Sequence, residues 1–203
     1  MNWDLLFNYI QPSSFIDIGA HVGDFTYTVK SKFPKCECLM IEANPYCEPY
    51  LKLNGNSYVM AALTSKRTKL PLFVEKINKI GTGASLYKEN TRFYEEGKFD
   101  IIEVETETLD SLNISPSQMI DLIKIDTQGS ELDVLLGGEK TFKRSKYILI
   151  EVSLVEYNIG SPLIDNIMKQ MREYHFKIED IIGYHYNNNQ IFQMDVLFKN
   201  LYI

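Results

Sequence analysis

Short apolar runs and amphipathic segments alternate along most of the chain. A continuous apolar run bounded by glycine, asparagine or charged residues is typical of a strand that is buried on both faces of a sheet. The strands predicted in this way cover residues 15–19, 38–43, 57–63, 121–126 and 147–152.

The segments between these strands have the spacing of helices. Asp24 precedes a stretch in which Phe25, Val29 and Phe33 recur every four residues, which places them on one helical face. Ser130, followed three residues later by Asp133, resembles a capping box. The predicted helices cover residues 24–33, 44–53, 130–138 and 161–174.

The C-terminal segment has a different pattern. Residues 191–200 alternate between apolar and polar positions, as a strand with one buried face does. A second strand-like segment, 176–186, and an asparagine turn at 187–189 precede it, so the two segments predict an antiparallel hairpin. Strand–helix alternation that ends in a hairpin predicts an α/β fold with a doubly wound, mostly parallel sheet and an antiparallel edge.

Residues 64–120 are longer than a single helical crossover requires. They contain two strand-like segments, 70–76 and 101–109, and a glycine- and tyrosine-rich stretch, 81–98, which we call the flap. Two interpretations remain open: the flap helps to form a substrate pocket, or the insertion is a surface excursion that extends the sheet. We expect a single domain over residues 1–203 with this insertion inside it.

Composition and charge narrow the class of protein. The chain has 21 Lys and Arg against 27 Asp and Glu, a formal net charge of −6, which disfavours nucleic acid as the main partner. No apolar run approaches the ~20 residues of a membrane span, and the N-terminal segment lacks signal-peptide features, so we expect a cytoplasmic protein without a membrane partner. Cys36 and Cys38 lack zinc-ligand spacing, and we expect no metal from spacing alone.

The end of the first predicted strand carries the first chemical signal. Ligands of open α/β sheets bind beyond the carboxyl ends of the strands, where Asp17, Gly19 and Gly23 form an acid-x-Gly-x-x-x-Gly loop. A dinucleotide loop would need glycine at positions 21 and 24, which are His21 and Asp24 here, and Asp24 would face the pyrophosphate. An NAD-dependent oxidoreductase is therefore disfavoured.

A cofactor without phosphates fits this loop better. S-adenosylmethionine carries an amino group and a sulfonium, so Asp17 near the methionine amino group is favourable, and Glu42 can accept hydrogen bonds from ribose hydroxyls. The alternatives are that the glycines only form a turn and that Glu42 is a solvated strand end. The candidate cofactor-binding residues are Asp17, Gly19, Ala20, His21, Gly23, Glu42, Ala43 and Asp126.

The segments 15–26, 41–45, 123–137 and 193–198 resemble the FkbM family of S-adenosylmethionine-dependent methyltransferases. The resemblance implies a Rossmann-like class I methyltransferase fold with seven strands and methyl transfer to a hydroxyl, often on a sugar or a natural product. The family's cofactor loop, ribose ligand and fourth-strand acid then correspond to Asp17, Gly19, Gly23, Glu42 and Asp126. His21 departs from the asparagine that members commonly carry.

Methyl transfer to an alcohol requires loss of the hydroxyl proton, so a general base or a metal is useful. Asp126 and Glu151 at strand ends and Glu131 one turn along are the candidate catalytic residues. Glu131 could instead be favoured by the helix dipole, and Glu151 could be structural. We expect His185 on the surface of the edge hairpin, and Ser85 is a candidate for the acceptor pocket.

The sequence therefore predicts an O-methyltransferase with S-adenosylmethionine as cofactor and a small-molecule or saccharide hydroxyl as substrate. A homodimer is left open as a further partner. The competing class is a non-catalytic domain that binds the cofactor or a partner on the same scaffold. RNA methylation is disfavoured by the negative charge.

Overall fold

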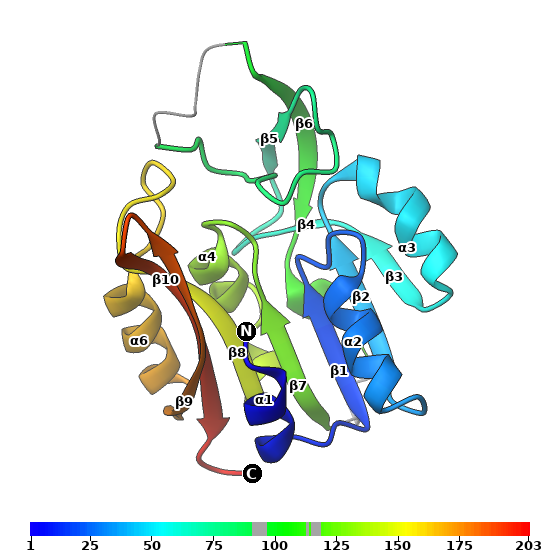
Figure 1. The fold of residues 1–203 in the computed structure, drawn as a ribbon, viewed down its shortest axis with the longest axis vertical. Helices are drawn as coiled ribbons and strands as arrows, with labels where there is room; N and C mark the ends of the chain where they lie inside the picture. The colour runs from blue at the N-terminus through cyan, green and yellow to red at the C-terminus, as the bar shows by residue number, and fades with distance from the viewer. Residues whose placement is uncertain (91–96, 113, 115–118) are drawn as a thin grey trace.

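The computed structural model describes residues 1–203 except 91–96, 113 and 115–118. The described residues form a seven-stranded sheet in the order β3-β2-β1-β7-β8-β10-β9 (Figure 1). Neighbouring strands are parallel except that β10 is antiparallel to both β8 and β9. The strands are β1 (Ser14–Ile18), β2 (Glu37–Glu42), β3 (Ser57–Met60), β7 (Ile120–Ile125), β8 (Ser145–Ser153), β9 (Phe176–Asn187) and β10 (Gln190–Asn200). The predicted α/β fold with an antiparallel C-terminal edge is confirmed.

Helices cover both faces of this sheet because alternate strand residues point to opposite sides. Ile123 and Ile148 pack with the helices α4 (Glu131–Leu136), α5 (Glu139–Lys143) and α6 (Ile164–Glu173). Leu122 and Leu149 lie in a second cluster with α1 (Trp3–Tyr9) and α2 (Asp24–Lys32). The sequence analysis did not predict α1, a seven-residue helix that begins after Asn2, whose side chain accepts the Leu5 N–H.

The second helical connection has the predicted length but is divided into two parts. A 3₁₀ turn, η1 (Pro45–Cys47), leads into α3 (Glu48–Asn54), and Leu51 of this helix packs with Met40 and Ala20. Asn44 begins the segment as expected, because its side chain accepts the Tyr46 N–H.

The insertion forms a second sheet above the carboxyl ends of the main sheet (Figure 1). Its strands are β4 (Ala62–Leu63), β5 (Lys69–Glu75) and β6 (Phe99–Glu107), in the order β4-β6-β5, followed by the 3₁₀ turn η2 (Leu109–Ser111). The interpretation that the insertion extends the main sheet is therefore wrong, since β5 and β6 pair with each other. Residues 91–96 of the flap lie outside the described residues.

Two local predictions also require correction. The strand predicted over 57–63 ends at Met60, and its last residues, β4, join the second sheet because the chain turns away from β2 at Ala61. Ser130 makes no capping hydrogen bond, and Asp133 instead accepts a hydrogen bond from the Tyr87 hydroxyl. No helix among the described residues is long and apolar enough to cross a membrane.

The C-terminal hairpin turns at two asparagines. Asn188 and Asn189 have φ angles of 48° and 63°, and they join β9 directly to β10. Two consecutive residues with positive φ form the type I′ turn that matches the twist of a hairpin, and asparagine tolerates this conformation. The hairpin brings β10 beside β8, where the candidate Glu151 lies.

Candidate functional site

A cavity of about 450 Å³ lies at the carboxyl ends of β1, β2 and β7. This is the position and the size expected of a small-molecule site in an open α/β sheet. The loop between β1 and α2, the end of β2 and the segment after β7 form its base. Flap residues 81, 82 and 84–86 form the side toward the second sheet, so the flap borders the cavity.

Backbone geometry explains two glycines of the β1–α2 loop. Gly19 has φ +74°, and a Cβ there would lie 1.8 Å from the carbonyl oxygen of Asp126. Gly23 has φ +93°, and a Cβ there would lie 2.6 Å from Nδ2 of Asn54. Both positions require glycine, because a side chain would meet a neighbour in a conformation that L-residues rarely adopt. The loop therefore crosses close to β7 at the base of the cavity.

Glu42 holds this loop and also lines the cavity. Its carboxylate accepts the backbone N–H of His21 and that of Asn44, both at 2.7 Å. Burial raises the pKa of Glu42, although these two N–H groups oppose the shift by stabilising the charged form. Glu42 is therefore a buried residue that is hydrogen-bonded to two loops, and it is not a solvated strand end.

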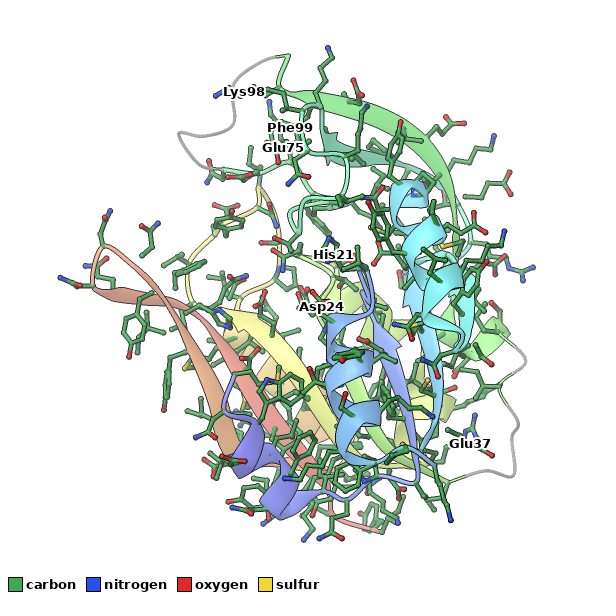
Figure 2. All side chains as sticks on the ribbon, turned by 45° about the vertical axis from the view of Figure 1, so that its right-hand side comes forward. His21, Asp24, Glu37, Glu75, Lys98 and Phe99 are labelled. Carbon is green, nitrogen blue, oxygen red and sulfur yellow. The ribbon has the colours of Figure 1, made fainter. Side chains whose placement is uncertain are left out.

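His21 connects the β1–α2 loop to the insertion. Its Nε2 donates to the carbonyl oxygen of Ile80 at 2.5 Å, and the Asn44 amide donates to that of Lys79 at 2.8 Å. Figure 2 shows His21 and Asp24 at the end of the loop that faces the second sheet. Both residues line the cavity.

Beneath the loop lies a buried lysine that the sequence analysis missed. The Nζ of Lys124 is 3.4 Å from Oδ1 of Asp17, 3.3 Å from Oδ2 of Asp126 and 3.2 Å from the carbonyl oxygen of Gly19. Burial alone would lower the pKa of Lys124, but Asp126 and Asp17 outweigh it and hold the pKa above its usual value. Lys124 correspondingly lowers the pKa of Asp126 against the effect of burial.

Asp17 was expected beside a methionine amino group, but its side chain has no solvent exposure. It accepts a hydrogen bond from the Thr26 hydroxyl at 2.8 Å and faces Lys124, which is its partner in the β1–β7 register. Asp17 and Gly23 are not among the described residues that line the cavity. The signal for Lys124 was a lysine inside a strand that is buried along its whole length, two residues before Asp126.

The three candidate catalytic acids occupy different environments. Asp126 lines the cavity, whereas Glu151 is joined to it through Gln128, whose Nε2 donates to Oδ1 of Asp126 at 2.8 Å and to Oε1 of Glu151 at 2.9 Å. Burial and the neighbouring Asp126 raise the pKa of Glu151 to about 8. Glu131 is buried behind the loop that joins β7 to α4, where its carboxylate accepts the N–H groups of Thr127 and Gly129.

Side chains of the flap contact the segment after β7. The Ser85 hydroxyl donates to the carbonyl oxygen of Gln128 at 2.6 Å, and the Tyr87 hydroxyl donates to Asp133 at 2.7 Å. Ser85 also lines the cavity, and its place in an acceptor pocket stays a prediction.

His185 is partly exposed on the hairpin, as predicted, but it also faces two carboxylates. Its side chain is 35% exposed, and its Nε2 lies 3.2 Å from Oδ2 of Asp195 and 3.4 Å from Oε2 of Glu151. The neighbouring Tyr184 and Tyr186 are exposed, because the strand alternates. His185 and Asp195 are ten residues apart in the sequence, and the hairpin brings their side chains together. Sequence spacing alone does not indicate this contact.

Comparison with known proteins shows which family this chain resembles. A family model described as the methyltransferase FkbM domain matches residues 17–178. The methyltransferase sdnD of Sordaria araneosa is 27% identical over 168 residues, which cover 67% of this chain and 64% of sdnD. The chain thus spans less than two thirds of the length of that relative.

Solved structures share the fold at low sequence identity. The magnesium protoporphyrin IX methyltransferase of Synechocystis PCC 6803, with bound SAM, has a TM-score of 0.56 and 6% identity, over 98% of this chain and 74% of its own. A SAM-dependent methyltransferase of Methanosarcina mazei has a TM-score of 0.55 and 7% identity, over 99% of both chains. These similarities agree with the strand order and confirm the Rossmann-like methyltransferase fold.

Proposed function

The chain belongs to the FkbM methyltransferase family, and on this basis we propose that it is an S-adenosylmethionine-dependent O-methyltransferase acting on a hydroxyl of a small molecule or a glycan. The observation that carries the proposal is the cavity at the carboxyl ends of the strands, where the β1–α2 loop, Glu42 and Asp126 meet. Six of the eight residues expected to bind the cofactor line it: Gly19, Ala20, His21, Glu42, Ala43 and Asp126.

The charges around the cavity favour a cationic donor. Glu42 and Asp126 both line it, and Asp24 lies at the first turn of α2, where a pyrophosphate would otherwise bind. A carboxylate oxygen that accepts one backbone N–H keeps a second lone pair, so Glu42 can also accept from a ribose hydroxyl. Asp17 acts through Lys124, which it holds against the Gly19 carbonyl oxygen. This distribution supports a sulfonium donor over NAD.

The reaction needs positioning and one proton acceptor. S-adenosylmethionine, when bound, would supply the methyl group to the acceptor oxygen and leave as S-adenosylhomocysteine with the electron pair of the broken carbon–sulfur bond, and the hydroxyl proton would pass to a base of this chain. We assign the base to Asp126, because it is the catalytic candidate on the cavity wall. Glu131 positions the loop at Thr127 and Gly129, and Glu151 orients Gln128.

The flap supports a small acceptor. Thr82, Ala84 and Leu86 border the same cavity as the cofactor-loop residues, so a substrate hydroxyl would enter between the flap and the end of β7. The negative net charge of −6 supports a small molecule or glycan over a nucleic acid. The single domain, the homodimer and the cytoplasmic location stay predictions.

The first test is a thermal-shift titration with S-adenosylmethionine, S-adenosylhomocysteine and NAD. A ligand at 100 times its Kd adds about 2.7 kcal/mol, which corresponds to roughly 5–10 °C for a chain of this size. We expect both adenosyl compounds to raise the Tm and NAD to leave it unchanged. A flat response to all three would contradict the cofactor assignment.

Catalysis is tested separately with methyl-labelled S-adenosylmethionine and a panel of small-molecule and saccharide alcohols. Asp126→Asn should bind the cofactor but transfer the label at least ~100-fold more slowly than the unmodified chain, the usual contribution of a general base. Cofactor binding without transfer to any alcohol would favour the non-catalytic binding domain. Normal transfer by the variant would remove Asp126 from the reaction.

A further inference from the structure

Three side chains that can bind metals converge on adjacent strands beyond Asp126. Glu151 on β8 is the register partner of Asp195 on β10, and His185 on β9 reaches toward both. One oxygen of each carboxylate and the His185 Nε2 lie within 4.8 Å of one another. The hairpin brings His185 and Asp195 together, and pairing of β10 with β8 adds Glu151.

The separations suit a shared ion. The His185 Nε2 is 3.2 Å from Oδ2 of Asp195 and 3.4 Å from Oε2 of Glu151. An ion about 2.1 Å from each of its ligands places neighbouring ligand atoms roughly 3.0–3.4 Å apart in octahedral or tetrahedral geometry. The same Nε2 faces both carboxylates, so a cation between them would take the place of a proton on this nitrogen.

Neighbouring groups hold the two carboxylates in place. The side chains of Glu151 and Asp195 are 9% and 7% exposed. Oε1 of Glu151 accepts the amides of Gln128 and Gln193 at 2.9 and 3.0 Å, which leaves Oε2 directed at His185. A metal site needs such hydrogen bonds to orient its ligands.

A glycine provides the space that Asp195 requires. Gly183 is the register partner of Asp195 on β9, and a Cβ at this position would lie 2.2 Å from Oδ2 of Asp195. The carboxylate oxygen that faces His185 therefore occupies a position that a side chain on β9 would block.

Three carboxylates lie in or beside this cluster. Asp126 lies nearby through Gln128, and the amino group of Met1 is 3.9 Å from Oδ2 of Asp195. Each carboxylate has a basic neighbour: His185 for Glu151, His185 and the Met1 amino group for Asp195, and Lys124 for Asp126. A divalent cation would compete with His185 protonation and with the Met1 amino group for the carboxylates of Glu151 and Asp195.

We propose that Glu151, His185 and Asp195 bind one divalent transition-metal ion of the Mn²⁺ or Zn²⁺ class. Imidazole together with carboxylates favours these ions over Mg²⁺ or Ca²⁺, which prefer oxygen ligands. Glu151, His185 and Asp195 are not among the described residues that line the cavity, so a bound ion would act on the proposed reaction through Gln128, which joins Glu151 to Asp126. That role rests on the proposed function, whereas binding of the ion does not.

The test uses the full chain, freed of metal with a chelator and titrated with MnCl₂ in the absence of cofactor and acceptor. Electron paramagnetic resonance of free Mn²⁺ should show one ion bound per chain, displaced by Zn²⁺. Glu151→Gln, Asp195→Asn and His185→Gln should each weaken binding at least 10-fold. Glu173→Gln, an exposed acid on α6, is the matched control and should bind as the unmodified chain does. Equal binding by all variants, or no stoichiometric binding, would overturn the site.

A second measurement does not depend on the variants folding. The chain has three histidines, and bound Mn²⁺ should broaden the ring-proton NMR signal of His185 before those of His21 and His175. Uniform broadening, or none, would overturn the proposal. A thermal shift with S-adenosylmethionine but no Mn²⁺ binding would remove the metal site and leave the proposed function. Mn²⁺ binding without that shift would support the site and remove the proposed function.

Discussion

At the scale of single residues, the base of the cavity depends on buried charges that neutralise one another. Lys124 lies between Asp17 and Asp126 and also donates to the Gly19 carbonyl oxygen. It therefore couples the end of β7 to the β1–α2 loop. Glu42 connects the same loop to the start of η1 through two backbone N–H groups.

Lys124→Met should lower the free energy of unfolding by about 3–5 kcal/mol, because it leaves two buried carboxylates without their cation. Urea denaturation at neutral pH measures the change. Lys169→Met, an exposed lysine on α6, is the control and should change stability by less than about 0.5 kcal/mol. A loss at position 124 no larger than that of the control would mean that Asp17 and Asp126 are stabilised in another way.

Glu42→Gln should weaken S-adenosylmethionine binding by about 1–3 kcal/mol, because an amide oxygen is a poorer acceptor than the carboxylate for the loops and the ribose. Isothermal titration calorimetry measures the affinity. Glu48→Gln, at the start of α3, is the control. It removes the same charge at a residue that is not among the described residues lining the cavity. Similar affinities for all three proteins would place the ribose elsewhere.

At the scale of elements, periodicity was sufficient for most strands and helices, because a strand buried on both faces and an amphipathic helix leave distinct patterns. It was insufficient where partners distant in sequence determine the outcome. The division of residues 57–63 between two sheets depends on pairing of β4 with β6. The position of His185 depends on how the hairpin packs against β8, and that of Lys124 depends on Asp17 across the sheet. Ser85 and Asp126 could be predicted, since each lies at a loop or strand end that faces the cavity.

The flap is held by hydrogen bonds to the elements that form the cavity. Amide exchange at residues 79–88 should therefore slow when S-adenosylhomocysteine binds, because the ligand stabilises the β1–α2 loop to which His21 connects Ile80. Hydrogen-exchange mass spectrometry measures this, with α6 as an internal reference. Exchange that is equally slowed in the flap and in α6 would indicate global stabilisation, and an unchanged flap would count against its role at the site.

At the scale of the whole molecule, the two sheets are joined to each other by hydrogen bonds around the cavity. The second sheet is fixed to the main sheet through Ile80, Lys79 and Ser85, all of which meet residues around the cavity. The family match from residue 17 to 178 includes the second sheet and the main sheet from the end of β1 to the start of β9. The predicted single domain of residues 1–203 is consistent with these contacts and stays a prediction.

We expect both sheets to unfold in one transition. Trp3 is the single tryptophan, and it packs on Phe25 and borders the cavity. Its fluorescence and the far-ultraviolet circular dichroism should give the same Tm, and S-adenosylhomocysteine should shift both equally. Two separate midpoints would indicate that the insertion folds as a unit of its own.

The close approach of Gly19 to the backbone of Asp126 also bears on changing what the protein accepts. Since a Cβ at position 19 would lie 1.8 Å from the Asp126 carbonyl oxygen, a randomised library at this position would consist almost entirely of inactive clones. Thr82, Ala84 and Leu86 border the cavity from the flap, and each already carries a Cβ there. Directed evolution toward a new acceptor should therefore diversify the flap and keep Gly19 constant.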